Sequence, residues 1–199
     1  MTTCLPAEVQ QAIAGYYGVE DAPSVDDFID ARDEDGAREM LLVRDGGDEL
    51  EVTLRLPRKA LATRPGFDAL CQLVEGVSHF LFVAERARRE LPVTHLELEL
   101  QAEVDKYVLF AHEGPFTGAF DPGRAARVRE HLFGRPSFLH PRGTEPGDRY
   151  RMANDLAARF AGRLEAIFAA RGRFGEMRAA LRRFYGVGQA EKIQLARAA

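Results

Sequence analysis

One stretch of the chain, residues 66–113, constrains the fold more than any other. In its first half, apolar residues recur at steps of three and four from Phe67 to Leu91, which is the spacing of one face of an α-helix. Pro92 follows the pattern, and a proline disfavours the helical conformation in the residue before it. The sequence therefore predicts one long amphipathic helix. Its polar side is expected to carry Asp68, Gln72, Glu75, His79, Arg86 and Glu90.

The second half, residues 94–111, fits two kinds of structure. Leucine, alanine and valine alternate with acidic residues and glutamine from Leu96 to Asp105, and a period of two is also typical of a strand. Leu, Glu, Gln and Ala favour a helix. Thr94 with Glu97 three residues later matches a capping box. The prediction is a second helix that packs antiparallel on the first, as a long helical hairpin; a strand paired with residues 39–56 is the alternative.

The N-terminal third combines a helix, an acidic segment and a β-hairpin. Pro6–Gly15 reads as a short helix. Residues 20–35 are rich in aspartate, and we expect a solvated acidic surface with one short helix anchored by Val25 and Phe28. Two alternating runs, 39–43 and 49–56, flank an Asp-Gly-Gly sequence, which is a strong hairpin signal. The expected buried face of the hairpin is Leu50, Val52, Leu54 and Leu56.

The C-terminal part shows further helical patterns. The first covers residues 121–133, with Asp121 as its N-cap and Pro122 in its first turn. The second covers residues 148–171, with Asp148 as its N-cap, and two further helices are expected over 174–184 and 189–198. In the last segment the expected anchors are Ile193 and Leu195. The predicted fold is α+β and predominantly helical: a multi-helix core around the helical hairpin, with the small β-hairpin packed on it. A single domain is expected over 1–199, made of residues 1–65, a helical core at 66–172 and a helical appendage at 173–199.

Composition limits the function classes. No run approaches the ~18 to 20 apolar residues that span a bilayer, and no secretory leader is apparent, so we expect a cytoplasmic protein without membrane contact. The net charge is −4, yet residues 1–120 carry 11 basic and 23 acidic side chains, whereas residues 121–199 carry 16 and 8. Such asymmetry indicates an anionic partner for the second part, or docking between the two.

Standard catalytic motifs are missing from the sequence: there is no phosphate-binding GxxxxGK[ST], no GxGxxG after a strand, no GxSxG and no HExxH. The best binding candidate is the breaker-rich segment 134–148 with the helix start behind it, because arginines near a helix N-terminus can hold phosphate or carboxylate. Its candidate residues are Arg135, His140, Arg142, Arg149, Tyr150, Arg151 and Asn154.

The alternative is a metal-dependent hydrolase. Glu75 and His79 are four residues apart on the first long helix, and Glu99 and Glu103 are four apart on the second. Carboxylates and imidazoles from facing helices build the metal sites of helical bundles. Only this alternative calls for a cofactor, a divalent metal.

The favoured function is that of a non-catalytic protein that binds a protein partner or a small anionic ligand without a cofactor. Nucleic-acid binding through the C-terminal arginines is not favoured, because the sequence pI is about 5.8 and only three of the 27 basic residues are lysine.

Overall fold

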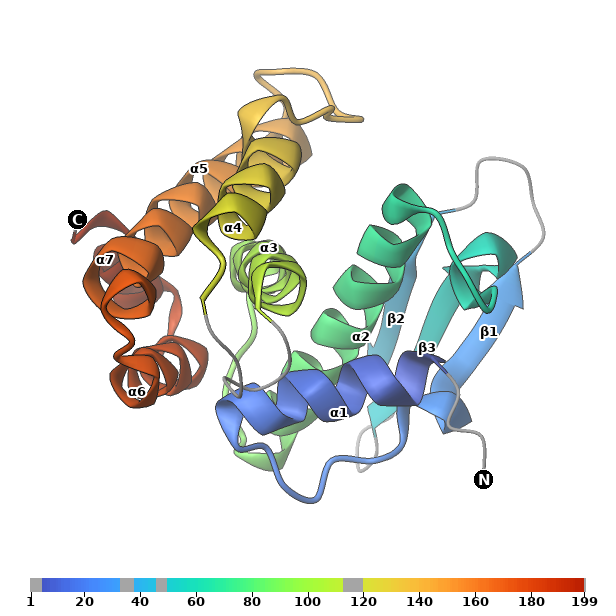
Figure 1. Cartoon of the computed structure of the whole chain (residues 1–199). Coiled ribbons are helices and arrows are strands. Elements are labelled where there is room, and N and C mark those ends of the chain that lie inside the picture. The colour runs from blue at the N-terminus through green and yellow to red at the C-terminus, as the bar shows by residue number, and fades with distance from the viewer. Residues whose placement is uncertain (1–4, 33–37, 46–49, 113–119, 199) are drawn as a thin grey trace. The chain divides into compact units, whose positions relative to one another are not determined.

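The computed structural model describes residues 5–32, 38–45, 50–112 and 120–198. The chain divides into two compact units, the first formed by residues 1–14 and 19–92 and the second by residues 15–18 and 93–199. The predominantly helical α+β class is confirmed, since the described residues form seven α-helices and one three-stranded sheet (Figure 1). The single domain expected from the sequence stays a prediction.

The first unit is a small sheet with helices. Its elements are α1 (Leu5–Tyr17, whose last turn belongs to the second unit), a 3-10 turn (Val25–Phe28), β1 (Ile29–Arg32), β2 (Met40–Asp45), β3 (Leu50–Pro57), a second 3-10 turn (Arg58–Leu61) and α2 (Phe67–Arg88). The strand order is β1-β3-β2.

The predicted pairing of the two alternating runs is confirmed, because β2 and β3 are antiparallel, with Val43 opposite Val52. The turn residues 46–49 lie outside the described residues. The helix expected in the acidic segment is wrong in part: a 3-10 turn covers Val25–Phe28, and Ile29–Arg32 form β1, which runs parallel to β3. β1 is held by backbone hydrogen bonds to the distant strand β3, and such pairing is only weakly predictable from the side chains of the strand itself.

The contact between α2 and β3 centres on Gly76. A Cβ atom added there would lie 2.9 Å from Cδ1 of Leu54 and 3.1 Å from Cδ2 of Leu56. Both leucines are completely buried, so the missing side chain lets the helix come down onto the strand. The predicted buried face of β3 is therefore confirmed at Leu54 and Leu56 and wrong at its beginning, where Leu50 is 42% exposed.

The expected polar side of α2 is wrong at three of its six residues, since Gln72, His79 and Arg86 are buried, whereas Asp68 and Glu90 are exposed and Glu75 is partly exposed. Gln72 and Arg86 each contact a partner on the same helix, which lowers the free-energy cost of burying their polar groups. Gln72 Nε2 donates to Asp68 Oδ2 at 2.7 Å, and the guanidinium of Arg86 lies 4.9 Å from the ring centre of Phe82.

By length and composition, α2 is apolar enough to cross a membrane, which the sequence reading did not anticipate. Its most apolar 18-residue window has a mean hydropathy of 1.3, and 67% of that window is buried inside the structure. The absence of membrane contact stays a prediction.

The second unit is helical. Its elements are α3 (His95–Ala111), α4 (Pro122–Arg129), a π-helical turn (Glu130–Gly134), α5 (Glu145–Arg163), a second π-helical turn (Leu164–Phe168), a 3-10 turn (Ala169–Arg171), α6 (Phe174–Gly186) and α7 (Gln189–Arg197). α3 packs on α5 and α4, and α5 packs on α7.

The ambiguous stretch 94–111 is a helix, as predicted. Thr94 accepts a hydrogen bond from the backbone N–H of Glu97, and the Glu97 carboxylate accepts one from the backbone N–H of Thr94, so the capping box is present. α2 and α3 belong to different units, and their packing as an antiparallel hairpin stays a prediction.

The cap of α4 is also as predicted, because Asp121 accepts from the N–H groups of Gly123 and Arg124. The start of α5 is not. Thr144 is its N-cap and the helix begins at Glu145, so Asp148 lies in the first turn. A threonine hydroxyl is also a good N-cap, and that of Thr144 accepts from the N–H of Gly147. Pro146 suits a first turn.

The C-terminal helix is anchored by a residue that its apolar pattern hides. Ile193 and Leu195 are only partly buried, whereas Lys192 is completely buried. The amino group of Lys192 donates to Oε1 of Gln101 at 2.6 Å and lies 4.4 Å from the ring centre of Phe184. The predicted anchors, Ile193 and Leu195, are therefore less buried than Lys192. A lysine can be buried this deeply when its amino group has a hydrogen-bond acceptor and an aromatic ring beside it.

Gly76 and Gly162 make a matched pair of tests, since both are helix-interior glycines. Only Arg129 Nη1, at 3.8 Å, would lie near a Cβ atom at Gly162. We expect Gly162→Ala to raise the free energy of unfolding by about 1 kcal/mol through helix propensity. Gly76→Ala should lower it by about 1 kcal/mol, because two buried leucines must move. Denaturant unfolding followed by circular dichroism measures both, and stabilisation at both positions would contradict the close packing of α2 on β3.

Candidate anion-binding groove on helix α5

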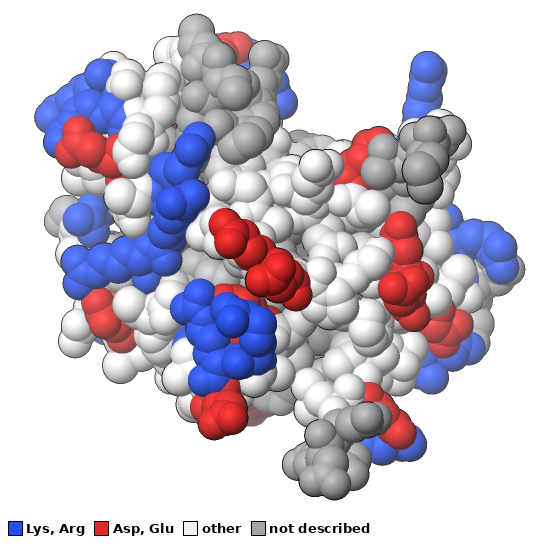
Figure 2. Space-filling view, turned by 90° about the horizontal axis from the view of Figure 1, so that it is seen from below, with Lys and Arg blue, Asp and Glu red and all other residues white. Residues whose placement is uncertain are grey.

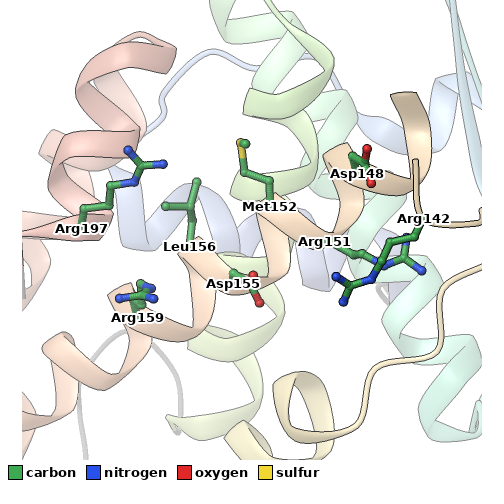
Figure 3. Close-up of a pocket in the computed structure, with 8 residues that line it drawn as sticks. All are labelled: Arg142, Asp148, Arg151, Met152, Asp155, Leu156, Arg159 and Arg197. Carbon is green, nitrogen blue, oxygen red and sulfur yellow. The ribbon is translucent and has the colours of Figure 1, made fainter. Parts of the chain in front are cut away.

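A pocket of about 590 Å³ opens along one face of α5. Its volume lies within the range of ligand-binding sites in proteins. It is lined by Arg142, Asp148, Arg151, Met152, Asp155, Leu156, Arg159 and Arg197 (Figure 3). We call this pocket the α5 groove.

Helical periodicity brings six of these residues to one face. From Asp148 to Arg159, each of them has another lining residue three or four positions away, and residues three or four apart are neighbours on a helix surface. Arg142 reaches the groove from the segment before α5, and Arg197 from the last turn of α7. Figure 3 shows Arg142 beside Arg151 toward one end, and Arg159 and Arg197 toward the other.

Two residues shape the segment that leads into α5. A Cβ atom at Gly147 would lie only 1.9 Å from the carbonyl oxygen of Pro141, so no other residue fits this close approach. Nη1 of Arg151 donates to the carbonyl oxygen of Gly147 at 2.7 Å and to that of His140 at 3.1 Å. The Arg151 guanidinium also lies 4.5 Å from the ring centre of Phe138. Arg151 thus fastens the segment to the helix.

The predicted binding residues fall into different places. Arg142 and Arg151 line the α5 groove, and His140 stacks on Tyr150 with ring centres 5.8 Å apart. Arg149 pairs with Glu145 at 2.5 Å and does not line the groove. Two further candidates are also elsewhere. Asn154 is buried and donates to the carbonyl oxygen of Leu132 at 3.3 Å, and Arg135 is exposed just after the first π-helical turn.

Some charged side chains of the groove already have hydrogen-bond partners and others have none. Oδ1 of Asp148 accepts from the backbone N–H of Gly143 at 3.0 Å, and Arg151 is bound to carbonyl oxygens. Within the part of the chain that the structure describes, no hydrogen bond or ion pair engages the side chains of Arg142, Arg159 and Arg197. Three exposed guanidinium groups therefore keep all their donors for a ligand.

Sequence reasoning missed Met152, Asp155, Leu156, Arg159 and Arg197 as groove residues. The residues on α5 carry a usable signal, because Arg151, Asp155 and Arg159 repeat at four-residue steps. Arg197 carries none, since it lies 38 positions beyond Arg159 and reaches the groove only through the packing of α7 on α5.

The residues of the metal alternative lie on two helices that belong to different units. Glu75 and His79 are on α2, with His79 buried, and Glu99 and Glu103 are on α3, with Glu99 buried. The carboxylate of Glu103 pairs with the amino group of Lys106 at 2.7 Å, so a local cation already balances its charge. The metal site stays a prediction.

A second group of polar residues lies inside the second unit. The buried Tyr107 donates its hydroxyl to Oε1 of Glu165 at 2.7 Å, and Arg129 pairs with the same oxygen at 2.9 Å. Glu165 sits in the second π-helical turn. Burial, and then the hydrogen bond to Glu165, raise the pKa of Tyr107 far above its usual range. Tyr107 is therefore a permanent donor that ties α3 to the end of α5.

The chain matches no protein-family model, no curated protein and no solved structure. The comparisons therefore supply no function for the α5 groove, and its side chains are the basis for the proposal below.

The buried His112, at the C-cap of α3, makes the stability of the second unit depend on pH. Burial, and then the nearby Arg124, lower the pKa of His112 to about 4, from 6.5. Since the unfolded chain binds the proton first, stability should be present above pH 6.5 and be lost as the pH falls toward 4. Between pH 7 and 4.5 we expect His112→Gln to lose about 2 kcal/mol less than the wild type. Urea unfolding at the two pH values measures this, and equal losses would contradict a neutral buried imidazole.

Proposed function

We propose that the protein is a non-catalytic cytoplasmic binding protein whose α5 groove holds an anionic ligand, either a small molecule or an acidic segment of a protein partner. The observation that carries the proposal is the set of exposed arginines Arg142, Arg159 and Arg197, which have no partner among the described residues. Guanidinium groups bind carboxylate and phosphate through paired, charge-assisted hydrogen bonds.

Electrostatics favour an anion from outside. Four arginines and two aspartates line the α5 groove, and Arg151 and Asp148 already bind backbone groups. Like charges that converge on a hollow surface raise the local concentration of counter-ions. A bound carboxylate or phosphate would relieve the repulsion among the arginines at either end.

The lining residues also support binding without catalysis. The eight side chains are those of arginine, aspartate, methionine and leucine. Nucleophilic and acid–base catalysis employ serine, cysteine, lysine, histidine or a carboxylate close to the reacting atoms. Of these, the described lining offers only the carboxylates of Asp148 and Asp155, and Asp148 already binds a backbone N–H.

Nucleic acid remains the less favoured partner. Figure 2 shows one face on which basic side chains gather in several patches, each with acidic side chains close by. Several arginines of α6 and its flank are neutralised locally. Arg183 pairs with Glu191 at 2.7 Å, and Arg173 pairs with Glu176. A phosphate backbone needs a continuous basic track, which paired charges do not provide.

The test is the binding of a fluorescein-labelled hexaglutamate peptide, followed by fluorescence anisotropy at low salt with inorganic pyrophosphate as a competitor. The double variant Arg159→Gln, Arg197→Gln should weaken hexaglutamate binding by about tenfold, since each lost charge pair at an exposed site is worth up to about 1 kcal/mol.

The matched control is the double variant Arg149→Gln, Arg135→Gln. It removes the same charge from the same region, but from residues that do not line the α5 groove. It should bind hexaglutamate within about twofold of the wild type. Equal weakening in both double variants, or no binding by the wild type, would refute the proposal.

A further inference from the structure

We propose that the occupant of the α5 groove is an α-helix of another protein whose groove-facing residues run acidic, basic, acidic at four-residue steps. This inference rests on the proposed function and narrows it, because it names the partner's shape and charge order. Three features of the groove carry it: the order of its charges, the apolar surface between them, and the spacing of its two basic ends.

The charges along α5 alternate. Arg151, Asp155 and Arg159 follow one another at four-residue steps on one face. Arg142 adds a positive charge beside Arg151, and Arg197 adds one toward the Arg159 end (Figure 3). Asp148 precedes them in the first turn of α5, where its carboxylate accepts from the backbone N–H of Gly143. From Arg151 onward, the groove is therefore positive, negative and positive.

The negative centre distinguishes this groove from a simple anion site. Asp155 is exposed, and within the described part of the chain no hydrogen bond or ion pair engages its carboxylate. A wholly acidic ligand would place a negative charge against Asp155, and like charges brought together across an interface select against a partner. A basic group between two acidic groups satisfies all three positions.

An apolar surface accompanies the charges. Met152 lines the groove and is 43% exposed, and Leu156 beside it is 4% exposed, so Met152 supplies most of the apolar surface. Methionine and arginine are enriched at protein–protein interfaces, and a flexible methionine adapts to side chains of different shapes. The floor of the groove thus suits the apolar ridge of an amphipathic helix.

The spacing of the basic ends excludes small anions as the full occupant. Arg159 lies eight positions after Arg151, which corresponds to about 12 Å of helix rise. One phosphate or carboxylate reaches only one end. A partner helix that lies along α5 has the same rise per residue, so its groups at four-residue steps meet those of α5 one by one.

An extended peptide fits less well than a helix. Extended segments gain most of their affinity from main-chain hydrogen bonds to a sheet edge. The groove is walled by helices α5 and α7 and by the segment before α5, and the backbone groups inside a helix are already paired. Side chains on a helical face are the part of the groove that is open to recognition.

The partner is a different chain. No lysine, arginine or histidine of this sequence has an acidic residue both four positions before and four positions after it. A second copy of the protein therefore lacks the charge order that complements Arg151, Asp155 and Arg159.

The experiment uses three labelled helical peptides that differ only at three groove-facing positions spaced four residues apart: Glu-Lys-Glu, Glu-Glu-Glu and Lys-Glu-Lys. Fluorescence anisotropy with the full-length protein gives their dissociation constants. The wild type should bind Glu-Lys-Glu about threefold more tightly than Glu-Glu-Glu, which is the size of one exposed charge pair. Lys-Glu-Lys should bind weakest.

Two variants then test the role of the centre. Asp155→Lys should reverse the order and bind Glu-Glu-Glu more tightly than Glu-Lys-Glu. Glu145→Lys is the matched control, because it makes the same charge change on the same helix at an exposed residue that does not line the groove. Glu145→Lys should keep the wild-type order. A Glu-Glu-Glu peptide that binds the wild type as tightly as Glu-Lys-Glu, or an order that survives Asp155→Lys, would overturn the inference.

The two proposals fail in different ways. If hexaglutamate binds in a manner that depends on Arg159 and Arg197 while the helical peptides are not discriminated, the anion site stands and the helix inference falls. If neither hexaglutamate nor any helix binds, both fall. A concentration-dependent dimer in sedimentation velocity that Asp155→Lys dissociates would identify a second copy as the occupant, which also overturns the inference.

Discussion

The second unit depends on how it satisfies one buried amino group, that of Lys192. Burial of a lysine costs free energy unless its amino group finds acceptors and its stem finds apolar contacts. Lys192 meets both needs through Oε1 of Gln101 on α3 and the ring of Phe184 on α6. Gln101 in turn donates to Asp105 and Tyr17 at 2.9 and 3.0 Å, and Tyr17 donates to Asp105. Burial, and then Asp105, hold the pKa of Tyr17 well above its usual value, which keeps this phenol a donor.

This network has a consequence for the surface. α7 is nine residues long, too short to be stable alone in water, so its position depends on contacts with the rest of the unit. Among them are the buried Lys192, the hydrogen bond from Arg163 to the carbonyl oxygen of Leu195 and the ion pair of Arg183 with Glu191. Arg197 lies five residues after Lys192 and lines the α5 groove. The buried contact of Lys192 thus contributes to the position of a basic group on the other side of α7. The remaining walls have local causes: helical periodicity within α5, and Arg151 together with Gly147 at the segment before it.

Sequence reasoning succeeded where the signal is local. The capping box of Thr94 and Glu97 identified α3 despite its alternating pattern, Asp121 with Pro122 located α4, and the Asp-Gly-Gly signal located the antiparallel pair β2 and β3. It failed where a distant segment decides. The strand β1 exists through its pairing with β3, and Lys192 is buried because Gln101, 91 positions away, accepts its hydrogen bond. The candidate site shows the same division, since the arginines near residue 150 were visible in the sequence and Arg197 was not.

Hydrogen exchange of the α7 amides in a Lys192→Ala variant tests the central claim most directly, with Lys59→Ala as the control because Lys59 is exposed in the first unit. If Lys192 positions α7, its removal should speed the exchange of residues 189–197 by about tenfold or more. The variant leaves Oε1 of Gln101 without its donor and opens a cavity, and together these cost more than about 1.4 kcal/mol. Binding of hexaglutamate should then fall to the level of an Arg197→Gln variant, while the amides of α5 stay protected. Unchanged exchange in α7, or faster exchange with full hexaglutamate binding, would contradict the link between the buried lysine and the groove.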